Sequence, residues 1–381
     1  MSFRDVSKDI TKSLSKDTKQ SQGIFFTPKS ARDAVIELVL PYATDPKTIL
    51  EPSFGSGEFL EDLYERFPNA TITGVELNST LFNLSKRPNI HNVDFLSYKG
   101  KHEVIIGNPP YFVIQKSAET DLCQSGRPNM FVQFLYKSMT ENLTPSGILA
   151  FVLPTSFFNC AYYGRMRKWL YDNATILHAK RLEGEYIDTQ QETFALVVQY
   201  RPSSTKDFFI QLNTHTYITP LYKELIELTK NTRTLNTLGY SVKTGEVVWN
   251  QEKEKLQDSG TLLIYSSNLT TGKLLVGNLK TPKKQYIEGF TRPPLTGRSI
   301  LINRGYGNSA FTFTPVLVDE SAYYCENHVN VIRPTQAASL PIEDVLRSLR
   351  DPRTQKFIEY FVGNGALSKT EVECCLPIWI S

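Results

Sequence analysis

Short apolar runs of strand length alternate with helical patterns through the first 200 residues, and this rhythm strongly limits the possible folds. Each run ends at glycine, proline or polar residues, and most are followed by apolar residues at helical spacing. Such alternation predicts an α/β fold, a mostly parallel sheet with helices on both faces. The predicted strands are Thr48–Glu51, Thr71–Glu76, a short strand beginning at Val93, Glu103–Gly107, Ile148–Leu153 and Ala195–Tyr200. The predicted helices are Ala31–Leu40, Gly57–Phe67, Ser79–Lys86 and Phe131–Leu143.

The composition divides the chain into a tail and two domains. Residues 1–22 are polar and lysine-rich, and they predict a flexible tail with room for a short helix. Residues 23–235 contain the alternating pattern. From 236 to 381, short strand-like runs and many glycines predict a mixed, strand-rich second domain. The clearest helical patterns of that domain are Ile342–Leu349 and Arg353–Tyr360.

Cysteines, histidines and apolar segments limit the classes of protein to which the chain can belong. The five cysteines form no Cys-X-X-Cys pair, and the five histidines are scattered, so we expect neither a disulfide framework nor a metal site. The longest apolar run, Gly147–Phe158, is interrupted by Pro154 and is too short to cross a bilayer. These features predict a soluble, cytoplasmic protein with no membrane association.

Positive charge is concentrated in one region. Residues 201–310 contain 15 lysines and arginines against eight acidic residues, although the whole chain has a net charge of only +3. A basic region beside a mildly acidic remainder is typical of proteins that bind a polyanion. Chance clustering of surface lysines is the alternative interpretation.

A glycine-containing turn follows the first predicted strand. In Glu51-Pro52-Ser53-Phe54-Gly55-Ser56-Gly57, the glycines let the backbone turn tightly and approach a ligand. Glu76 ends the next strand, at the distance where an acidic residue grips the hydroxyls of a ribose. Asp94 and Phe95 follow the third strand, where a carboxylate could accept from an adenine amino group and a ring could stack on the base. Together these residues predict a nucleoside pocket; a solvated strand end and core packing are the alternatives for Glu76 and Phe95.

The segment Asn108-Pro109-Pro110-Tyr111 follows the fourth predicted strand. Two successive prolines fix the backbone and remove two donors, which leaves the carbonyl of Pro109 free to accept. The side-chain carbonyl of Asn108 is a second acceptor. Two acceptors directed at one aromatic amino group can hold both of its hydrogens, and Tyr111 offers a ring on which a planar base can lie. An ordinary Asn-Pro turn with a core tyrosine is the alternative.

These motifs resemble those of the N6-adenine DNA methyltransferases of restriction–modification systems, with the TaqI-type enzymes as the nearest likeness. The resemblance covers nearly the whole chain and implies a Rossmann-like fold that binds S-adenosylmethionine. It implies cofactor contacts from Thr27, Pro28, Glu51, Ser53, Gly55, Gly57, Glu76, Leu77, Asp94, Phe95, Asn108 and Pro110. It implies catalytic functions for Asn108, Pro109 and Tyr111, and for Tyr186 as a second aromatic residue on the other face of the base.

The resemblance also implies that residues 236–381 form a target-recognition domain for double-stranded DNA. Our candidates for DNA contact are Asn268, Arg298, Arg304 and Tyr306, since arginine suits guanine edges and phosphates. Asn327-His328 and the 363–367 segment are expected to serve folding. A monomer or weak dimer is expected, and a cognate restriction endonuclease would act independently.

The function that the resemblance implies is site-specific, adenine-specific DNA methylation, in a bacterial cell or a virus-infected host cell. The target adenine would be flipped out of the duplex, within a short palindromic site for which the TaqI likeness suggests TCGA. Two alternatives stay open at this point. Enzymes with the same catalytic segment modify guanine in ribosomal RNA or glutamine in release factors, and the chain could also be an inactive DNA-binding subunit.

Overall fold

The computed structural model describes residues 3–115, 128–184, 186–187, 189, 191–270, 272–277, 284–305, 312–362 and 366–380. Contacts within the chain define two compact units, Met1–Tyr222 and Lys223–Ser381. The composition places the second domain from residue 236. In the structure the second unit begins earlier, because Arg233 pairs with Ile378 near the end of the chain through two backbone hydrogen bonds of 3.2 and 2.7 Å. No described helix is long and apolar enough to cross a membrane.

Unit 1 is built on a seven-stranded sheet in the order β3-β2-β1-β4-β5-β7-β6. β7 pairs antiparallel with β5 and β6, and the other pairings are parallel, which confirms the predicted mostly parallel sheet. The strands are β1 (Thr48–Glu51), β2 (Thr71–Val75), β3 (Ile90–His91), β4 (His102–Gly107), β5 (Leu143–Pro154), β6 (Thr175–Arg181) and β7 (Thr193–Gln199), and the hairpin β8 (Phe209–Leu212) and β9 (His215–Ile218) forms a separate sheet.

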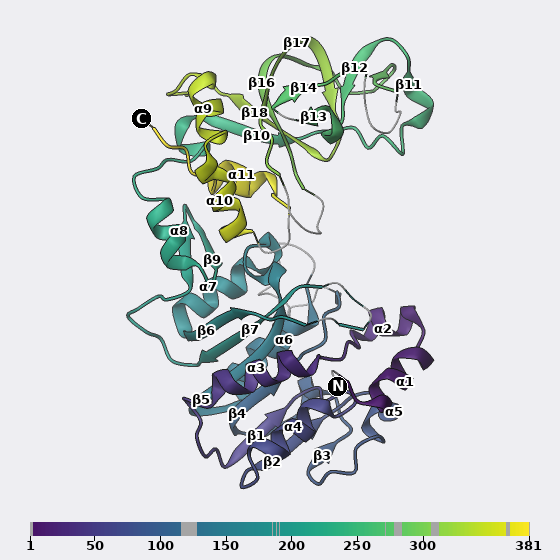
Figure 1. Cartoon of the computed structure of the whole chain (residues 1–381), viewed down its shortest axis with the longest axis vertical. Helices are drawn as coiled ribbons and strands as arrows, with labels where there is room; N and C mark the ends of the chain where they lie inside the picture. The colour runs from purple at the N-terminus through teal and green to yellow at the C-terminus, as the bar shows by residue number, and fades with distance from the viewer. Residues whose placement is uncertain are drawn as a thin grey trace. The chain divides into compact units, whose positions relative to one another are not determined.

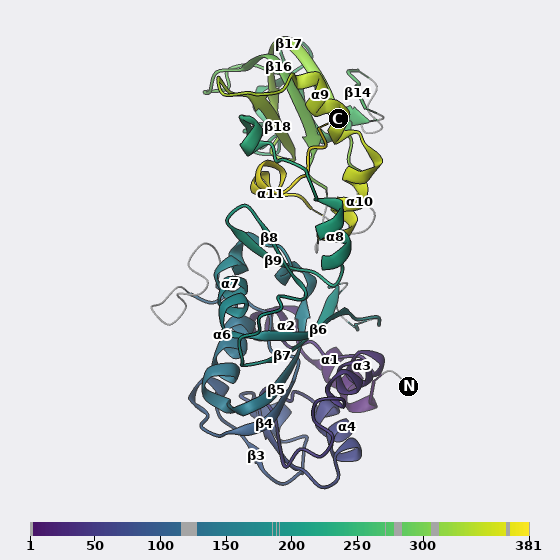
Figure 2. The same ribbon diagram turned by 90° about the vertical axis from the view of Figure 1, so that its left-hand side faces the viewer.

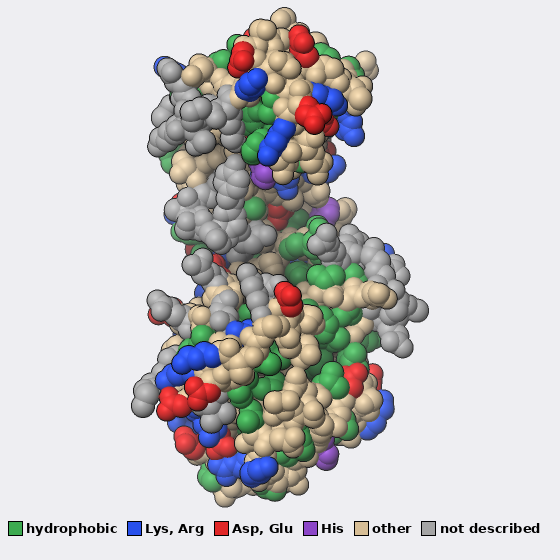
Figure 3. All heavy atoms as spheres, turned by 90° about the vertical axis from the view of Figure 1, so that its right-hand side faces the viewer, with side chains coloured by type: hydrophobic (Ala, Val, Ile, Leu, Met, Phe, Trp, Pro, Cys, Tyr) green, Lys and Arg blue, Asp and Glu red, His purple; other side chains and the backbone are tan. Residues whose placement is uncertain are grey.

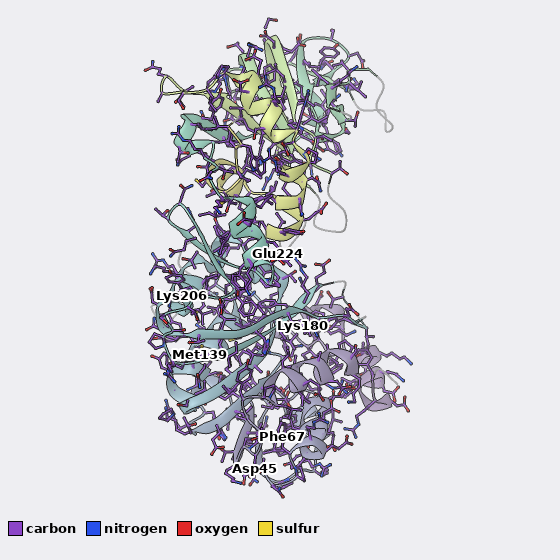
Figure 4. All side chains as sticks on the ribbon, turned by 60° about the vertical axis from the view of Figure 1, so that its left-hand side comes forward. Asp45, Phe67, Met139, Lys180, Lys206 and Glu224 are labelled. Carbon is purple, nitrogen blue, oxygen red and sulfur yellow. The ribbon has the colours of Figure 1, made fainter. Side chains whose placement is uncertain are left out.

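Helices cover both faces of this sheet (Figures 1 and 2). Along β5, Leu149, Phe151 and Leu153 point into one hydrophobic cluster, and Ile148, Ala150 and Val152 point into the other. Phe67 and Met139, labelled in Figure 4, belong to the two different clusters. The long helices of unit 1 are α3 (Lys29–Val39) and α4 (Glu58–Arg66) in the second cluster, and α6 (Met130–Lys137) and α7 (Gly164–Asn173) in the first.

The third predicted strand is wrong in position. β3 comprises only Ile90 and His91, which pair with Gly74 and Val75, so the strand ends before Val93. The reason is local: the side-chain amide of Asn92 donates to the carbonyls of Glu76 and Leu77, at 2.7 and 3.0 Å, in place of a further strand pair.

Two predicted helices also have different ends in the structure. α5 (Ser79–Phe82) ends four residues before the predicted Lys86. α6 passes into a π-helical turn (Ser138–Asn142), and β5 then begins at Leu143, so that Pro145-Ser146-Gly147 lies within the strand at a register shift against β4.

Residues 5–22 form two helices in the structure, α1 (Asp5–Ser13) and α2 (Lys16–Gln22), where the composition predicts a flexible tail. The side chain of Ser7 is buried and donates to the Ser56 hydroxyl at 2.8 Å, and the Arg4 backbone donates to Glu58 at 3.0 Å. α1 therefore adds a polar contact to the turn after β1, which local composition cannot reveal.

Gly23 ends α2 in the left-handed conformation, with φ of 65°. A Cβ atom at this position would lie 2.8 Å from the backbone nitrogen of Tyr111 and 2.9 Å from Cβ of Pro110. Only glycine satisfies both the backbone conformation and this close approach. The N-terminal helices are thus connected directly to the segment that follows β4.

Unit 2 contains a second seven-stranded sheet, in the order β10-β18-β16-β17-β12-β15-β11, in which only the pair β12–β17 is parallel. α9 packs against β16, and α11 against β10. The predicted helices near the C-terminus are confirmed as α9 (Ile342–Leu349) and α10 (Pro352–Phe361). The remaining elements are α8 (Tyr222–Leu228), which spans the boundary, β10 (Tyr240–Thr244), β11 (Leu256–Gln257), β12 (Thr261–Ile264), β13 (Leu269–Thr270), β14 (Lys273–Leu274), β15 (Tyr286–Ile287), β16 (Leu295–Asn303), β17 (Val316–Cys325), β18 (Val329–Pro334) and α11 (Lys369–Cys374).

Arg167 on α7 fixes the segment that follows β5. Its side chain is 1% exposed and donates to the carbonyls of Thr216 at 2.7 Å, Phe157 at 3.1 Å, Cys160 at 2.8 Å and Asn159 at 3.3 Å. A buried guanidinium is stable only when its donors are satisfied, and here backbone oxygens satisfy them.

We predict that Arg167→Met lowers the free energy of unfolding of unit 1 by about 3 kcal/mol, because it leaves buried carbonyls without donors. Urea unfolding followed by circular dichroism measures this. Lys168→Met is the matched control on the same helix, since Lys168 is half-exposed and pairs with Asp172 at the surface; its cost should stay below about 1 kcal/mol. Equal losses of unfolding free energy in the two variants would show that the buried hydrogen bonds of Arg167 do not stabilise unit 1.

Candidate functional site

The turn after β1 and the corner after β4 lie next to each other because β1 and β4 are neighbours in the sheet. Ile49 pairs with Val104 and Leu50 with Ile105; β2 and β3 lie beyond β1, and β5, β7 and β6 lie beyond β4. Crevices at such a switch point are the usual ligand sites of open α/β sheets. The Ser53 hydroxyl donates to the carbonyl of Asn108 at 3.2 Å and so joins the two segments.

A cavity of about 500 Å³ opens at this edge of the sheet. Its walls come from the end of α2 and the segment after it, from the exits of β1, β2 and β4, and from α6. Of the predicted cofactor residues, the cavity is lined by Ser53, Gly55, Glu76, Leu77, Asp94, Phe95, Asn108 and Pro110. Thr27, Pro28, Glu51 and Gly57 lie outside this lining.

Glu76 is held in a fixed orientation at the cavity wall. Its carboxylate accepts from the backbone N–H of Gly55 at 2.9 Å and of Asn78 at 2.7 Å. Burial raises the pKa of Glu76 above its ordinary value, and the two backbone donors partly oppose this. The remaining lone pairs of the carboxylate can accept from hydroxyl groups of a ligand, which is the chemistry that a ribose requires.

Phe95, which was expected to stack on an adenine base, lines the cavity but is mostly buried. The Phe95 side chain is only 2% exposed, and its ring packs against Phe134 in the hydrophobic core at a centroid distance of 4.6 Å. Leu77, by contrast, is 69% exposed and lines the cavity. Asp94 is exposed, and its carboxylate accepts from the backbone of Leu96 at 2.9 Å.

Several lining residues were not identified from the sequence. They come from the end of α2, from α5 and from α6, and no local motif marks them. The set comprises Ser21, Gln22, Asn78, Ser79, Thr80, Leu81 and Phe134. The cavity is also lined by Gly23, Ile24, Phe25, Phe26, Pro52, Phe112 and Met130, which lie in segments that resemble those of the family. On the face of unit 1 that Figure 3 shows, hydrophobic side chains gather centrally and charged ones lie at the margins.

The carboxamide of Asn108 is bound on both of its ends. The NH2 group donates to the Thr27 hydroxyl at 3.0 Å and to the carbonyl of Phe25 at 3.3 Å. The carboxamide oxygen accepts from the Tyr111 hydroxyl at 2.5 Å, and the same hydroxyl lies 2.7 Å from the carbonyl of Val152 in β5. The amide therefore directs its acceptor toward the side of the corner on which Tyr111 lies.

Two tyrosines lie at the same edge of the sheet. Burial, with a contribution from Tyr186, raises the pKa of Tyr111 well above its ordinary value. Tyr186 shares a hydrogen bond of 2.9 Å with the hydroxyl of Thr193, which pairs with Pro154 at the end of β5, and burial raises its pKa to about 12. Both phenols are therefore neutral at physiological pH.

A buried ion-pair network supports the N-terminal side of the site. Arg32 on α3 donates to Asp62 at 2.5 Å and to Glu58 of α4, and it also donates to the carbonyl of Thr27 at 2.5 Å. Arg32 is 4% exposed. No local motif marks this network, because Glu58 and Asp62 lie 26 and 30 residues from Arg32 in the chain.

Glu51 is fully buried at the end of β1 and does not line the cavity. Burial, together with the charge of Glu76, raises the pKa of Glu51 well above its ordinary value. Among the described residues, its Oε2 atom has no hydrogen-bond partner. The side chain packs beside Gly107, where a Cβ atom would lie 3.3 Å from Cγ of Glu51. Glu51, at the end of β1, therefore contacts the end of β4.

One predicted DNA contact is buried in the structure, and two others already form contacts within the protein. Asn268 is 0% exposed; its amide donates to Leu275 and accepts from the Tyr265 backbone at 2.7 Å, so it stabilises a turn of unit 2 and presents no surface to DNA. Arg298 is 45% exposed and forms an ion pair with Glu343 at 2.5 Å, which lowers the pKa of Glu343. Arg304 donates to the carbonyl of Asn327 at 3.1 Å. Tyr306 lies outside the described residues.

Comparison with known proteins relates the chain to DNA modification enzymes. The model of the Eco57I restriction-modification methylase family matches residues 47–187. Modification methylase CviBIII of Paramecium bursaria Chlorella virus NC1A is 32% identical over 379 residues, covering 96% of each chain. The type II methyltransferase M.CvrRI of Paramecium bursaria Chlorella virus XZ-6E is 28% identical over 391 residues, covering 97% of this chain and 98% of that protein.

The fold of both units also has a counterpart among solved structures. A cryo-EM structure of a DrdV–DNA complex superposes with a TM-score of 0.54 at 13% sequence identity. The match covers 98% of this chain and 57% of that chain. The likeness supports the fold of an α/β unit followed by a mostly antiparallel second unit.

We predict that Glu76→Gln weakens binding of S-adenosylhomocysteine by about ten- to a hundredfold, because hydrogen bonds to a charged acceptor contribute about 1.5–3 kcal/mol. Isothermal titration calorimetry measures the change. The matched control is Glu61→Gln on α4, where Glu61 pairs with Arg87 at the surface. Unchanged affinity for Glu76→Gln would contradict the ribose assignment.

The raised pKa of Glu76 adds a pH dependence to this prediction. Protonation removes the carboxylate that accepts from the ligand, so wild-type affinity should fall as the pH is lowered from neutrality toward that raised pKa. Glutamine does not titrate, and the decline due to this group should be absent in Glu76→Gln. Parallel pH profiles for the two proteins would assign the titration to another group.

Proposed function

This chain belongs to the type II restriction–modification DNA methyltransferases, and we propose that the atom it methylates is the N6 nitrogen of an adenine flipped out of double-stranded DNA. The observation that carries the proposal is the Asn108 carboxamide, whose oxygen points away from the N-terminal segment at the corner after β4. The target adenine would lie within a short palindromic sequence. A cognate endonuclease would act independently on the same sequence.

The cavity suits S-adenosylmethionine in size and in chemistry. When bound, the cofactor supplies an electrophilic methyl group on a sulfonium. Glu76 would accept hydrogen bonds from the ribose hydroxyls, and Leu77 would contact the adenine ring of the cofactor. The backbone at Gly55 and the hydroxyl of Ser53 lie at the same wall, and Asn108 and Pro110 separate this cavity from the acceptor side.

The Asn108–Pro109 corner would position the acceptor nitrogen. The carboxamide oxygen of Asn108 and the carbonyl of Pro109 each accept one hydrogen of the adenine amino group, which directs the nitrogen lone pair toward the methyl group. The lone pair would accept the methyl group that the bound cofactor supplies, S-adenosylhomocysteine would leave, and the proton lost from the nitrogen would pass to solvent. Positioning by these two oxygens requires no covalent intermediate with the protein.

Tyr111 and Tyr186 would compensate the cost of base flipping. Extruding a paired adenine costs a few kcal/mol, and stacking on aromatic rings offsets part of that cost. Tyr111 precedes the cavity-lining Phe112, and Tyr186 lies on the segment between β6 and β7. We assign the two rings to opposite faces of the extruded base.

Unit 2 would provide target recognition. The viral relatives named as DNA modification enzymes align over nearly the whole chain, unit 2 included, which favours DNA over ribosomal RNA or a release factor as substrate. Arg298 is a candidate for a phosphate contact because it is half-exposed, and its partner Glu343 could be exchanged for a phosphate. Arg304, whose side chain binds a backbone carbonyl, would act by shaping its loop.

We predict that Asn108→Ala reduces methyl transfer to duplex DNA at least about a thousandfold, the scale seen when an oriented polar group in an active site is removed. Affinity for S-adenosylhomocysteine should change by less than about threefold, because Glu76 stays in place and the hydrogen bonds of the Asn108 amide go to Phe25, Thr27 and Tyr111. Transfer of labelled methyl groups and calorimetry measure the two effects. Full activity in this variant would refute the role of Asn108.

The methylated base is tested separately. Base-resolved mapping of DNA from cells that express the wild-type chain should show N6-methyladenine at one short sequence, and none with the Asn108→Ala variant. Methylation of cytosine, or of ribosomal RNA in place of DNA, would refute the proposed substrate even if Asn108 proved essential.

We predict that Tyr186→Ala lowers transfer about tenfold or more, whereas Tyr186→Phe stays within about threefold of the wild type, because the ring contributes stacking worth about 1–3 kcal/mol. Ile187→Ala is the matched control, since Ile187 is the exposed neighbour. A base-flipping readout with 2-aminopurine at the target position distinguishes loss of stacking from loss of folding. Equal activity of the alanine and phenylalanine variants would remove Tyr186 from the site.

A further inference from the structure

We propose that Thr27 is a positioning residue whose hydroxyl sets the direction of the Asn108 carboxamide. The sequence suggested a direct cofactor contact for Thr27. In the structure Thr27 does not line the cofactor cavity, and it is 5% exposed. Its hydroxyl instead accepts from the amide nitrogen of Asn108 at 3.0 Å. The inference rests on the proposed function, because it concerns the oxygen that would receive the acceptor amino group.

An asparagine can serve as an acceptor only if its oxygen, and not its nitrogen, faces the substrate. The carbonyl of Phe25 can only accept, so the group that faces it must be the NH2 of Asn108, at 3.3 Å. The Thr27 hydroxyl takes the second hydrogen of this NH2 over the shorter distance. With both hydrogens bound to residues 25–27, the oxygen is directed to the opposite side.

The groups on the opposite side do not choose an orientation by themselves. The Tyr111 hydroxyl lies within hydrogen-bond distance of both the Asn108 oxygen and the Val152 carbonyl. If its own proton went to Val152, the same hydroxyl could accept from an Asn108 NH2 group. A rotated amide would then be tolerated at Tyr111, and it would present donors to an amino group that also donates. The choice is therefore made by residues 25–27, where the Phe25 carbonyl admits only a donor and the Thr27 hydroxyl binds the second hydrogen of the same NH2 group.

Thr27 is itself held rigidly. Its carbonyl accepts from the buried guanidinium of Arg32 at 2.5 Å, and Arg32 is paired with Asp62 and Glu58. Pro28 follows directly and caps α3, which restricts the backbone further. The chain of contacts runs from α4 through Arg32 and Thr27 to Asn108, and all of its members lie in unit 1.

The test compares Thr27→Val, which keeps the shape and removes the hydroxyl, with Thr27→Ser, which keeps the hydroxyl. We expect Thr27→Val to lower kcat for methyl transfer to duplex DNA by about tenfold, the effect of losing about one hydrogen bond in the transition state. Its affinity for S-adenosylhomocysteine should stay within about twofold of the wild type. Thr27→Ser should stay within about threefold in both measurements.

Thr11→Val controls for the loss of a buried threonine hydroxyl in the N-terminal segment. Thr11 is buried and donates to the carbonyl of Ser7 within α1, away from the corner after β4. This control should leave kcat unchanged. Thermal unfolding of each variant shows whether any loss of kcat follows a loss of folded protein.

An Asn108→Asp background gives the decisive readout. A carboxylate has two equivalent oxygens and no NH2 group, so its acceptor needs no orientation by Thr27. Adding Thr27→Val to this background should change kcat by less than about twofold, against about tenfold beside Asn108. If the Asn108→Asp protein transfers no methyl group, the inference is tested by comparing Thr27→Val with Thr27→Ser. A lower kcat in Thr27→Val alone, with similar affinities for S-adenosylhomocysteine, supports the positioning role.

Three results would overturn the inference. They are an unchanged kcat in Thr27→Val, a lost affinity for S-adenosylhomocysteine with kcat unchanged, and an equal effect of Thr27→Val in both backgrounds. Total transfer of labelled methyl groups to DNA is the readout, so these results do not depend on which base is modified. Failure of the adenine assignment would appear only in the base-resolved mapping and is distinguishable from failure here.

Discussion

The parallel pairing of β1 with β4 is the constraint on which the site depends. The strands that follow β1 in the chain lie on one side of this pair, and the strands that follow β4 lie on the other. The exits of the two strands cannot be covered by a single crossover and leave a crevice between the glycine turn and the Asn108 corner. The hydrogen bond from Ser53 to the Asn108 carbonyl shows how closely the two exits approach. The pairing of β1 with β4 therefore brings the glycine turn and the Asn108 corner together.

The N-terminal segment completes the site from outside the sheet. Gly23 lies against the corner after β4, the 21–26 stretch lines the cavity, and Thr27 binds Asn108. A buried arginine would be unstable alone, and Arg32 remains buried because two carboxylates of α4 and the carbonyl of Thr27 satisfy it. The network therefore couples the packing of α3 and α4 to the orientation of the Asn108 amide.

Sequence reasoning was most accurate where a local pattern has one physical meaning. The alternation of strands and helices gave the mostly parallel sheet, and the glycine turn, Glu76 and Asn108 lie at one cavity as expected. It was least accurate where tertiary packing decides. Asn268 was expected to contact DNA, but its amide stabilises a buried turn; Phe95 was expected to stack on a base, and its ring both lines the cavity and packs against Phe134 in the core. An aromatic or an amide side chain looks the same in a sequence whether it faces a ligand or the interior.

The sequence by itself determined the type of fold and the local backbone of the Asn108 corner, because hydrophobic period, glycine and proline act through the local backbone. Only the tertiary structure decided that residues 5–22 are helical and in contact with the turn after β1, that Leu77 provides the exposed apolar wall, and which way the Asn108 amide faces. These features depend on hydrogen bonds and packing between residues up to about 80 positions apart in the chain. No window of neighbouring residues contains that information.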